Sequence, residues 1–377
     1  MLITNNHLLE DCCAQLSQDQ VIAVDTEFMR SHVYYPQFSL IQISGAGQTF
    51  AVDMLLPLDH TPLKKLLSNT SSLKIIHAAK QDLEVIFQTL QLIPPNIFDT
   101  QIAGIFLGYA DSPSFETLVF DFLGIRISKS LHFSNWLARP LSEGQLKYAL
   151  SDASLLYKLF FRIETVLKER KMFDWTLEES AIIATSCQKP TQSLELLKRF
   201  TGRMRTPLEF IKCYRILVWR EEKAKALNIP RGHVLKDEAI MDMCVKKIQD
   251  IEALFKARIF SRSLDRKDIL SLHDSLVSNI TTEEELEVLE ELNSTKKLQR
   301  HKTTFAYMLK ILLEAVAQDI GIQPSFIASS GDLAAFIAKR PSRIDNSWRY
   351  EVFGQRAAAL NEGRILLGYK DGIPFFS

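Results

Sequence analysis

The sequence predicts an α/β domain, a mixed sheet with flanking helices, followed by all-α domains. Short apolar runs bounded by glycine and polar residues fill residues 19–53, which is typical of strands. Helical patterns then alternate with one further strand and dominate from about residue 176. The 377 residues also exceed the usual domain length of roughly 100–200 residues, so we expect several domains.

Three strands in meander order are expected near the start of the chain, at 21–24, 40–43 and 49–52. A Gly45-Ala46-Gly47 turn separates the second from the third. A helical stretch around 62–69 leads to a fourth strand at 74–77. Helical patterns follow at 80–90, 99–109, 114–123 and 142–168.

The second half of the chain is predicted to be all-α. Segment 208–227 has helical apolar spacing, and Thr281 and Thr282 each precede an acid by three residues, as in a capping box. Breaks are expected at 188–190 and 293–295. We therefore predict a sheet domain, a helical linker and two small helical units, at 1–175, 176–205, 206–290 and 298–377.

Composition favours a soluble cytoplasmic protein. The five cysteines contain no C-x-x-C pair, which argues against a disulfide framework or a cysteine zinc site. No run approaches the roughly 18 apolar residues of a membrane span, and the start lacks the pattern of a signal peptide. We expect no membrane association, and no feature indicates an obligate protein partner.

The net charge of zero conceals an uneven distribution. Residues 1–200 carry 17 Lys and Arg against 21 Asp and Glu, whereas residues 201–377 carry 28 against 24. Segment 196–236 holds 11 cations against three acids, a net charge of +8. Two interpretations stay open: a solvated helix face with i,i+4 ion pairs, or a surface that contacts phosphates.

Familiar motifs for nucleotide-triphosphate, dinucleotide, zincin and serine-esterase chemistry are absent, and the candidate catalytic groups are carboxylates. Asp25 and Glu27 end an apolar run at i and i+2, so an extended chain points both to one face. Hard divalent cations take such oxygen ligands. Alone, the pair is better explained by two solvated acids at a strand end, because Asp82 and Glu84 show the same spacing.

Three further residues extend this set. Asp82 opens a helix just after the strand at 74–77, where an acid also favours the helix dipole. Tyr148 and Asp152 lie four residues apart, on one helix face, and form the only Y-x-x-x-D in the chain. The four acids share a position at the edges of elements, where a site on a central sheet can be assembled.

The motifs resemble a known family in three places along residues 20–160. Residues 21–43, VIAVDTEFMR with YYPQ and LIQI, resemble the first exonuclease motif of the DEDD superfamily as found in ribonuclease D. Residues 76–85, continued by 99–101, resemble the second. Residues 136–152 resemble the third, in its tyrosine-containing version. Residues 217–237 are similar to the helical HRDC domain, and the final segment resembles a second such unit loosely, at Trp348-Arg349.

The resemblance implies an RNase H-like exonuclease domain followed by HRDC-type helical domains. It implies a metal-dependent 3′→5′ exoribonuclease that hydrolyses phosphodiester bonds at RNA 3′ ends and releases 5′-mononucleotides. The expected substrates are tRNA precursors or other structured RNA with 3′ extensions, and the expected cofactors are two divalent ions, Mg²⁺ or Mn²⁺.

By the same resemblance, Asp25 would bridge both ions, Glu27 and Asp152 would hold the ion that activates water, and Asp82 would hold the other. Tyr148 would orient the attacking water, since a phenol with an ordinary pKa near 10 is a weak base at pH 7.

Substrate-binding roles are expected for Thr26, Phe28, His77, Arg220, Lys223 and Arg231. Phe28 is slightly better explained by core packing than by stacking on a base. His77 is better explained as a satisfied histidine at a strand end than as a phosphate contact. Arg139 and Gln42 belong to the motifs and are expected to hold motif loops in place.

Two rival functions stay open. The same fold and mechanism could serve a DNA 3′→5′ exonuclease, because no sequence feature distinguishes a 2′-hydroxyl contact. The chain could also be a catalytically silent RNA-binding adaptor, which the presence of all four acids and the tyrosine disfavours. A comparison of matched RNA and DNA oligonucleotides as substrates distinguishes the exoribonuclease from the DNA exonuclease. Titration with Mn²⁺ distinguishes it from the adaptor, which need not bind metal through carboxylates.

Overall fold

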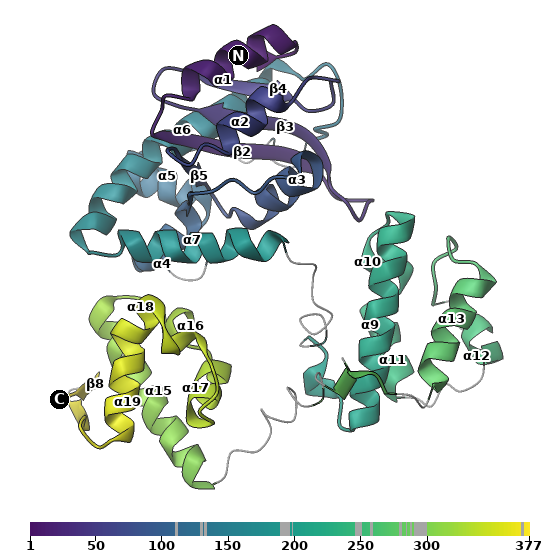
Figure 1. The fold of residues 1–377 in the computed structure, drawn as a ribbon, viewed down its shortest axis with the longest axis vertical. Helices are drawn as coiled ribbons and strands as arrows, with labels where there is room; N and C mark the ends of the chain where they lie inside the picture. Colours follow the sequence, from purple (N-terminus) through teal and green to yellow (C-terminus); the bar gives the residue numbers. More distant parts are fainter. Residues whose placement is uncertain are drawn as a thin grey trace. The chain divides into compact units, whose positions relative to one another are not determined.

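The computed structural model describes residues 1–109, 112–128, 131, 134–188, 197, 199–245, 251–256, 259–278, 281–283, 285–286, 289, 300–370 and 373–377. Figure 1 shows the chain as a ribbon. It divides into two compact units. The first comprises Met1–Glu27, Phe38–Gln188 and Lys297–Ser377, and the second comprises Phe28–Gln37 and Lys189–Lys296.

A mixed six-stranded sheet forms the centre of the N-terminal part, in the order β1-β4-β3-β2-β5-β6. Its strands are β1 (Leu2–Ile3), β2 (Val21–Met29), β3 (Gln37–Ser44), β4 (Thr49–Asp53), β5 (Leu73–Ile76) and β6 (Ile97–Asp99). β3 runs antiparallel to β4, while β2, β5 and β6 are mutually parallel, with Ala23 opposite Ile75 and Ile76 opposite Asp99. The parallel strands therefore end at one edge of the sheet.

The predicted mixed sheet and its β2-β3-β4 meander are confirmed. β1 and β6 were missed because two or three residues cannot show a strand pattern. Both are placed by pairing instead: β1 lies parallel to β4, and β6 lies parallel to β5.

Helices flank this sheet: α1 (Asn6–Leu16), α2 (Thr61–Leu67), α3 (Lys80–Leu90), α4 (Thr100–Phe106), α5 (Phe115–Leu123), α6 (Glu143–Glu169) and α7 (Phe173–Gln188). Their starts follow local chemistry, since Asn5, Asp99, Ser114 and Ser142 each accept a hydrogen bond from the first turn. The core between sheet and helices includes Phe98, whose ring meets Phe160 edge-on at 5.1 Å. α7 packs against β6, α3 and α4.

Residues 300–377 belong to the same unit and form what we call the C-terminal body. Its elements are α15 (Arg300–Ile320), α16 (Pro324–Ile327), α17 (Ser330–Ile337), η2 (Arg343–Asp345), α18 (Ser347–Arg349), η3 (Tyr350–Gly354), α19 (Gln355–Asn361), β7 (Leu367–Lys370) and β8 (Ile373–Phe376). The antiparallel β7-β8 hairpin corrects the all-α expectation for this part. Its four-residue strands carry too short an alternation to stand out, and they pack on α15.

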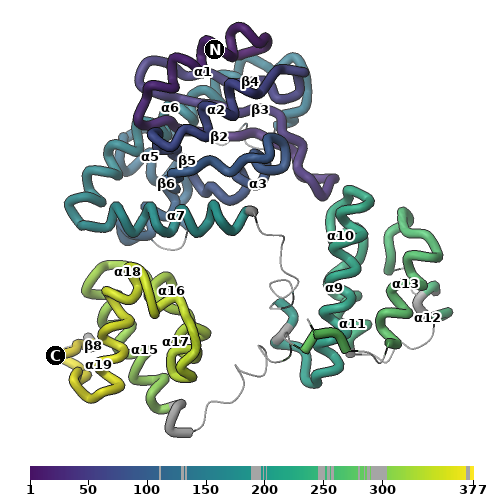
Figure 2. The backbone as a smooth tube through the Cα atoms, in the orientation of Figure 1, coloured from purple at the N-terminus to yellow at the C-terminus, as the bar shows by residue number. Residues whose placement is uncertain are grey.

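The described part of the second unit is helical apart from segment 28–37, which begins in β2, and an isolated antiparallel bridge between Leu235 and Phe260. Its elements are η1 (Thr201–Arg203), α9 (Pro207–Leu227), α10 (Arg231–Val234), α11 (Asp237–Val245), α12 (Ile251–Lys256) and α13 (Arg266–Val277). The predicted helix at 208–227 is confirmed, and a capping box between Thr206 and Glu209 starts it. Figure 2 shows segment 28–37 beside α10, where Tyr34 and Tyr35 donate their amides to Asn228 Oδ1, at 3.1 and 3.0 Å.

The predicted capping box at Thr282 is present, because Thr282 and Glu285 exchange backbone-to-side-chain hydrogen bonds of 3.0 and 3.2 Å. The predicted breaks at 188–190 and 293–295 lie outside the described residues apart from Gln188, which ends α7. The four domain bounds stay predictions.

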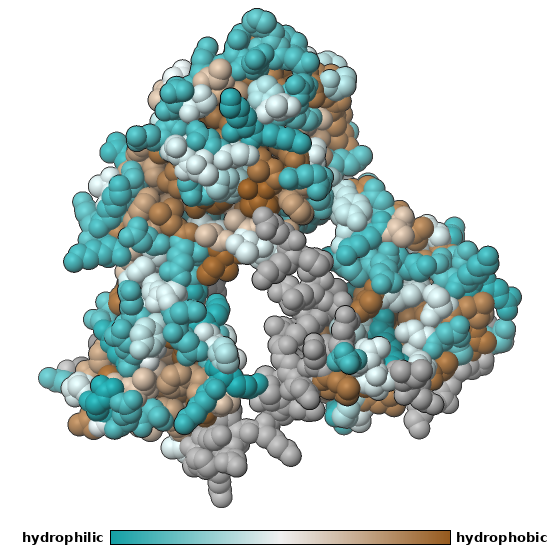
Figure 3. Space-filling view, in the orientation of Figure 1, coloured by the Kyte–Doolittle hydropathy of each residue, from teal (hydrophilic) through white to brown (hydrophobic). Residues whose placement is uncertain are grey.

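Hydrophilic residues cover most of the face drawn in Figure 3, and apolar residues occupy smaller areas between them. Within the described part of the chain, no helix is long and apolar enough to cross a membrane.

Candidate active site

Strand β2 carries the first acids. Asp25 and Glu27 keep some solvent access, whereas Thr26, between them, is buried. Thr26 donates its hydroxyl to Asp82 Oδ1. This bond joins two motifs that are 56 residues apart and fixes the orientation of the Asp82 carboxylate relative to β2.

Asp82 lies in the first turn of α3, and the turn before it is held from a neighbouring strand. Asp99, at the end of β6, accepts hydrogen bonds from the amides of Ala78 and Ala79 at 2.9 and 2.8 Å, and from Gln101 at 2.8 Å. Ala78 has a φ of 54°, a conformation that costs a non-glycine residue energy. Asp99 is thus a residue supporting the site that our prediction omitted, because the short strand β6 that places it shows no sequence pattern.

Helix α6 presents Tyr148 and Asp152. A capping box of Ser142 and Gln145 begins this helix. The Tyr148 hydroxyl hydrogen-bonds to Asp152, and its ring lies 6.0 Å from that of the buried Trp136. The predicted i,i+4 pair therefore does share one face.

The loop before α6 is tied to the sheet by Arg139. Its guanidinium binds both carboxylate oxygens of Asp53, at 2.6 and 2.7 Å, and the carbonyl of Trp136 at 2.8 Å. The Arg139-Pro140 peptide is cis. The loop-holding role expected for Arg139 is confirmed. Gln42 is buried, but among the described residues its amide has no hydrogen-bond partner, so that expectation is not met.

All four acids have raised pKa values. Burial, then Asp82 and Asp152, raise the pKa of Asp25 well above its ordinary value. Burial, then Asp25 and Asp152, raise the pKa of Glu27 to about 10. Burial raises the pKa of Asp82 to about 7 and that of Asp152 to about 6. The effects of Asp82 and Asp152 on Asp25 and Glu27 require that the carboxylates share one neighbourhood.

Tyr148 belongs to the same neighbourhood. Burial, then the charges of Asp152 and Glu27, raise the pKa of Tyr148 above its ordinary value. The phenol therefore keeps its proton at neutral pH and can act as a hydrogen-bond donor.

The donor set fits a hard divalent cation. In the part of the chain that the structure describes, no Lys, Arg or His forms a salt bridge with any of the four acids. Within the same residues, no three His, Cys, Asp or Glu side chains already stand close enough to hold a metal ion. The carboxylates thus share a region without forming a ligand shell, and binding would require them to turn toward the ion.

The residues predicted around the acids have differing surroundings. His77 shares a hydrogen bond of 3.0 Å with Thr100 through Nδ1, and burial lowers its pKa to about 4. A neutral, bonded ring agrees with the satisfied-histidine interpretation. Phe28 is half-buried, with the Arg30 guanidinium 5.8 Å from its ring centre. Glu116, which our prediction omitted, raises the pKa of both His77 and Asp152.

The three predicted phosphate-binding cations lie in the second unit and are engaged there. Arg220 is buried and donates to Leu235 O and to Asp237. Lys223 pairs with Asp268, and Arg231 pairs with Glu221. Their contacts link helices of that unit.

Comparisons with known proteins agree with this geometry. A family model described as 3′-5′ exonuclease matches residues 1–168, and one described as HRDC domain matches residues 213–267. Ribonuclease D of Bartonella henselae is 34% identical over 97% of this chain and 90% of its own length. Ribonuclease D of Zymomonas mobilis is 33% identical over 98% and 96%. The chain belongs to the ribonuclease D family.

Solved structures show the same fold. The crystal structure of Escherichia coli RNase D covers 96% of this chain and 98% of its own, with a TM-score of 0.77 and 23% identity. The catalytic core of RRP6 from Trypanosoma brucei covers 73% and 78%, with a TM-score of 0.57 and 22% identity. The predicted resemblance and fold class are confirmed. The chain is a hydrolase of the 3′→5′ exonuclease class. Its fold implies that the activity depends on divalent metal ions.

Proposed function

We propose that this chain shortens RNA from its 3′ end to 5′-mononucleotides, with Asp25, Glu27, Asp82 and Asp152 as the metal ligands. One observation carries the assignment: four acids from β2, α3 and α6 share one neighbourhood with raised pKa values, and no cation among the described residues neutralises them. The proposed cofactors are two ions, Mg²⁺ or Mn²⁺. When bound, such ions generate a hydroxide-like nucleophile and stabilise the departing oxygen.

The chain's own side chains prepare this chemistry. Thr26 fixes the Asp82 carboxylate, and Asp99 fixes the turn that presents it. Tyr148 keeps its proton and orients the attacking water by a hydrogen bond, so it positions rather than deprotonates. The buried Trp136 ring lies beside the Tyr148 ring and limits its movement.

We propose that RNA, and tRNA precursors in particular, contact the basic segment of the second unit. Because Arg220, Lys223 and Arg231 are engaged in ion pairs, the exposed Arg203, Arg205 and Lys236 are better supported as phosphate contacts. Each such contact adds salt-dependent affinity without sequence preference. The five free cysteines agree with the proposed cytoplasmic location.

The test uses an end-labelled tRNA precursor with a 3′ extension, with Mg²⁺, with Mn²⁺ and with a chelator. Wild-type protein should release labelled mononucleotides only with metal, and Asp25→Ala should bind the RNA without shortening it. A matched DNA oligonucleotide runs in parallel. Faster cleavage of DNA would transfer the activity to DNA, and intact RNA under every condition would refute the proposal.

A further inference from the structure

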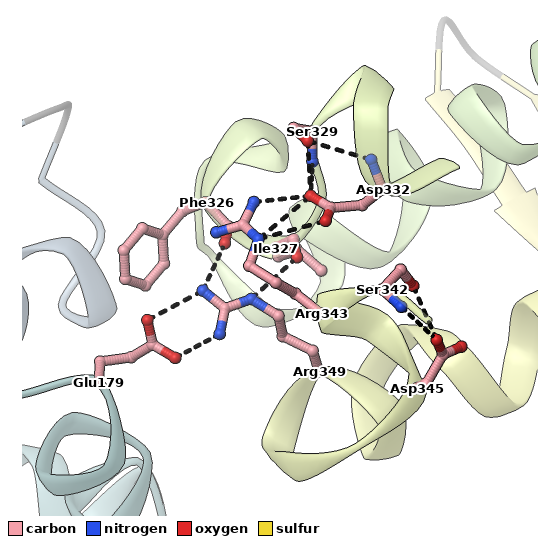
Figure 4. Close-up of polar contacts among 9 residues, drawn as sticks. All are labelled: Glu179, Phe326, Ile327, Ser329, Asp332, Ser342, Arg343, Asp345 and Arg349. Atoms are coloured by element: carbon pink, nitrogen blue, oxygen red, sulfur yellow. Dashed lines mark hydrogen bonds and ion pairs between the residues drawn. The ribbon is translucent and has the colours of Figure 1, made fainter. Parts of the chain in front are cut away.

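Helix α7 carries a buried carboxylate, Glu179, that binds the C-terminal body. Trp348 Nε1 donates to Glu179 Oε1 at 2.8 Å. Arg349 donates to both Glu179 oxygens, with 3.0 Å from Nη2 to Oε2. Figure 4 shows the Arg349 guanidinium facing the Glu179 carboxylate as a two-pronged pair.

Apolar contacts surround this pair. The Trp348 ring stacks on Trp175 of α7 at 5.4 Å and meets Phe106 of α4 edge-on at 5.1 Å. Arg349 also donates to the carbonyls of Ile327 and Phe326, both at 3.1 Å, so two further donors are used within the C-terminal body. The C-terminal body thus contacts α7 through one buried ion pair and one aromatic stack, in addition to the packing of α7 on β6, α3 and α4.

Ser180, the residue after Glu179, faces the nuclease sheet. Its hydroxyl accepts a hydrogen bond from the amide of Asp99 at 3.0 Å and donates to Thr176 O at 2.7 Å. The carboxylate of the same Asp99 holds the amides of Ala78 and Ala79. One buried series of bonds thus runs from the C-terminal body to the turn before Asp82.

We propose that Glu179 is a positioning residue of the nuclease site, through which Trp348 and Arg349 hold α7, Ser180 and Asp99 in the arrangement that presents Asp82. The inference rests on the proposed function, because it takes Asp82 to be a metal ligand. The C-terminal body is then part of the catalytic machinery, in addition to any role in RNA binding.

The turn before Asp82 is sensitive to such support. Ala78 adopts its left-handed φ of 54° only while surrounding bonds outweigh the local cost. Asp99 supplies two of those bonds, and Ser180 fixes the backbone of Asp99. Loosening α7 frees Ser180, which lets the 78–79 turn relax and moves the first turn of α3.

The primary experiment compares Glu179→Gln with Asp332→Asn in the full chain. Asp332 forms a similar pair with Arg343 inside the C-terminal body, 2.7 Å apart (Figure 4), and does not reach α7. In Glu179→Gln we expect the amides of Ala78, Ala79 and Asp99 to exchange hydrogen about tenfold faster. We also expect kcat to fall about tenfold at unchanged KM for RNA, whereas Asp332→Asn keeps both wild-type values.

Ser180→Ala is the second variant, because it removes the acceptor for the Asp99 amide and leaves Glu179, Trp348 and Arg349 intact. We expect faster exchange at the same three amides and a lower kcat, with a lowered thermal midpoint because the buried Asp99 amide loses its acceptor. Wild-type exchange in both variants overturns the proposal. If Glu179→Gln does not fold, wild-type exchange in Ser180→Ala alone overturns it.

Exchange is recorded without metal or RNA, so it does not depend on which residues bind metal. An active Asp25→Ala would refute the proposed metal site while leaving the exchange result valid. Failure of the further inference and failure of the proposed function are therefore distinguishable.

Discussion

Two sets of buried or partly buried carboxylates in this protein differ in their partners. Three acids outside the site are matched by arginine: Glu179 by Arg349, Glu285 by Arg215, and Asp53 by Arg139. The hydrogen bond from Arg215 lowers the pKa of Glu285. The four site acids have raised pKa values and, among the described residues, no such partner.

This difference in partners indicates that the arginine-matched acids stabilise the fold, whereas the site acids serve the proposed function. An arginine-matched carboxylate is compensated within the folded chain, so its loss leaves a buried cation. The site acids are uncompensated, so the fold holds electrostatic repulsion that a bound cation can relieve. Substitutions should consequently have opposite effects on stability in the two groups.

The largest effect is expected from Asp25→Ala. Losing the acid that is proposed to contact both ions should lower the exonuclease rate at least about 10³-fold. Single-turnover assays on end-labelled RNA measure it, with Asp59→Ala, an exposed acid of the same unit, as the control that keeps wild-type activity. A rate within tenfold of wild type would place the metal site elsewhere.

The next effect concerns the matched group. Arg349→Met leaves Glu179 buried without its partner, so the free energy of unfolding should fall by about 3–5 kcal/mol. Arg220→Met should cost less, about 1–3 kcal/mol, because its partner Asp237 is 45% exposed. Urea denaturation gives both values, and equal losses would show that burial of the acid does not decide the cost.

A smaller effect of opposite sign is expected from Asp82→Asn. Because folding raises the Asp82 pKa to about 7, its contribution to metal-free stability is full below pH 4 and is lost as the pH rises through 7. At pH 8 the metal-free variant should be more stable than wild type by roughly 1–3 kcal/mol. At pH 4 this gain should disappear. Thermal unfolding with a chelator tests both, and a variant less stable at pH 8 would contradict the uncompensated state.

The smallest effect is expected from Tyr148→Phe, which removes an uncharged hydrogen bond beside the acids. Turnover should fall about 10–100-fold with little change in KM. Tyr157→Phe, on the same helix, is the matched control. Equal losses in turnover and affinity would argue against water positioning.

The sequence predicted the elements that carry strong local patterns. β2 to β5 and α6 were found because apolar runs and caps are short-range features, and the four acids were singled out as a set by the resemblance of their motifs to a known family. Asp99 and Ser180 were not, because their role lies in pairing between segments 81 residues apart. Trp348-Arg349 was noticed as a loose resemblance to an HRDC unit, yet its contact with Glu179 depends on tertiary packing that no local pattern records.

Contacts between residues far apart in the sequence also explain why the predicted phosphate-binding role of the cations was not supported. Eleven positive charges in 196–236 were visible, but their partners were not. Glu285 lies 70 residues from Arg215, and Asp268 lies 45 from Lys223. Charge counting therefore located a basic segment without showing which of its cations the fold had already engaged.

The first unit is interrupted in sequence by the second, and this order has a consequence for synthesis. On a ribosome that adds 5–20 residues per second, Trp348 follows Gln188 by roughly 8–32 s. During that time Glu179 has been made, but the tryptophan and arginine that bind it have not. The nascent nuclease half thus lacks these core side chains during that time, and its activity should reach the full rate only when residues 300–377 have folded onto α7.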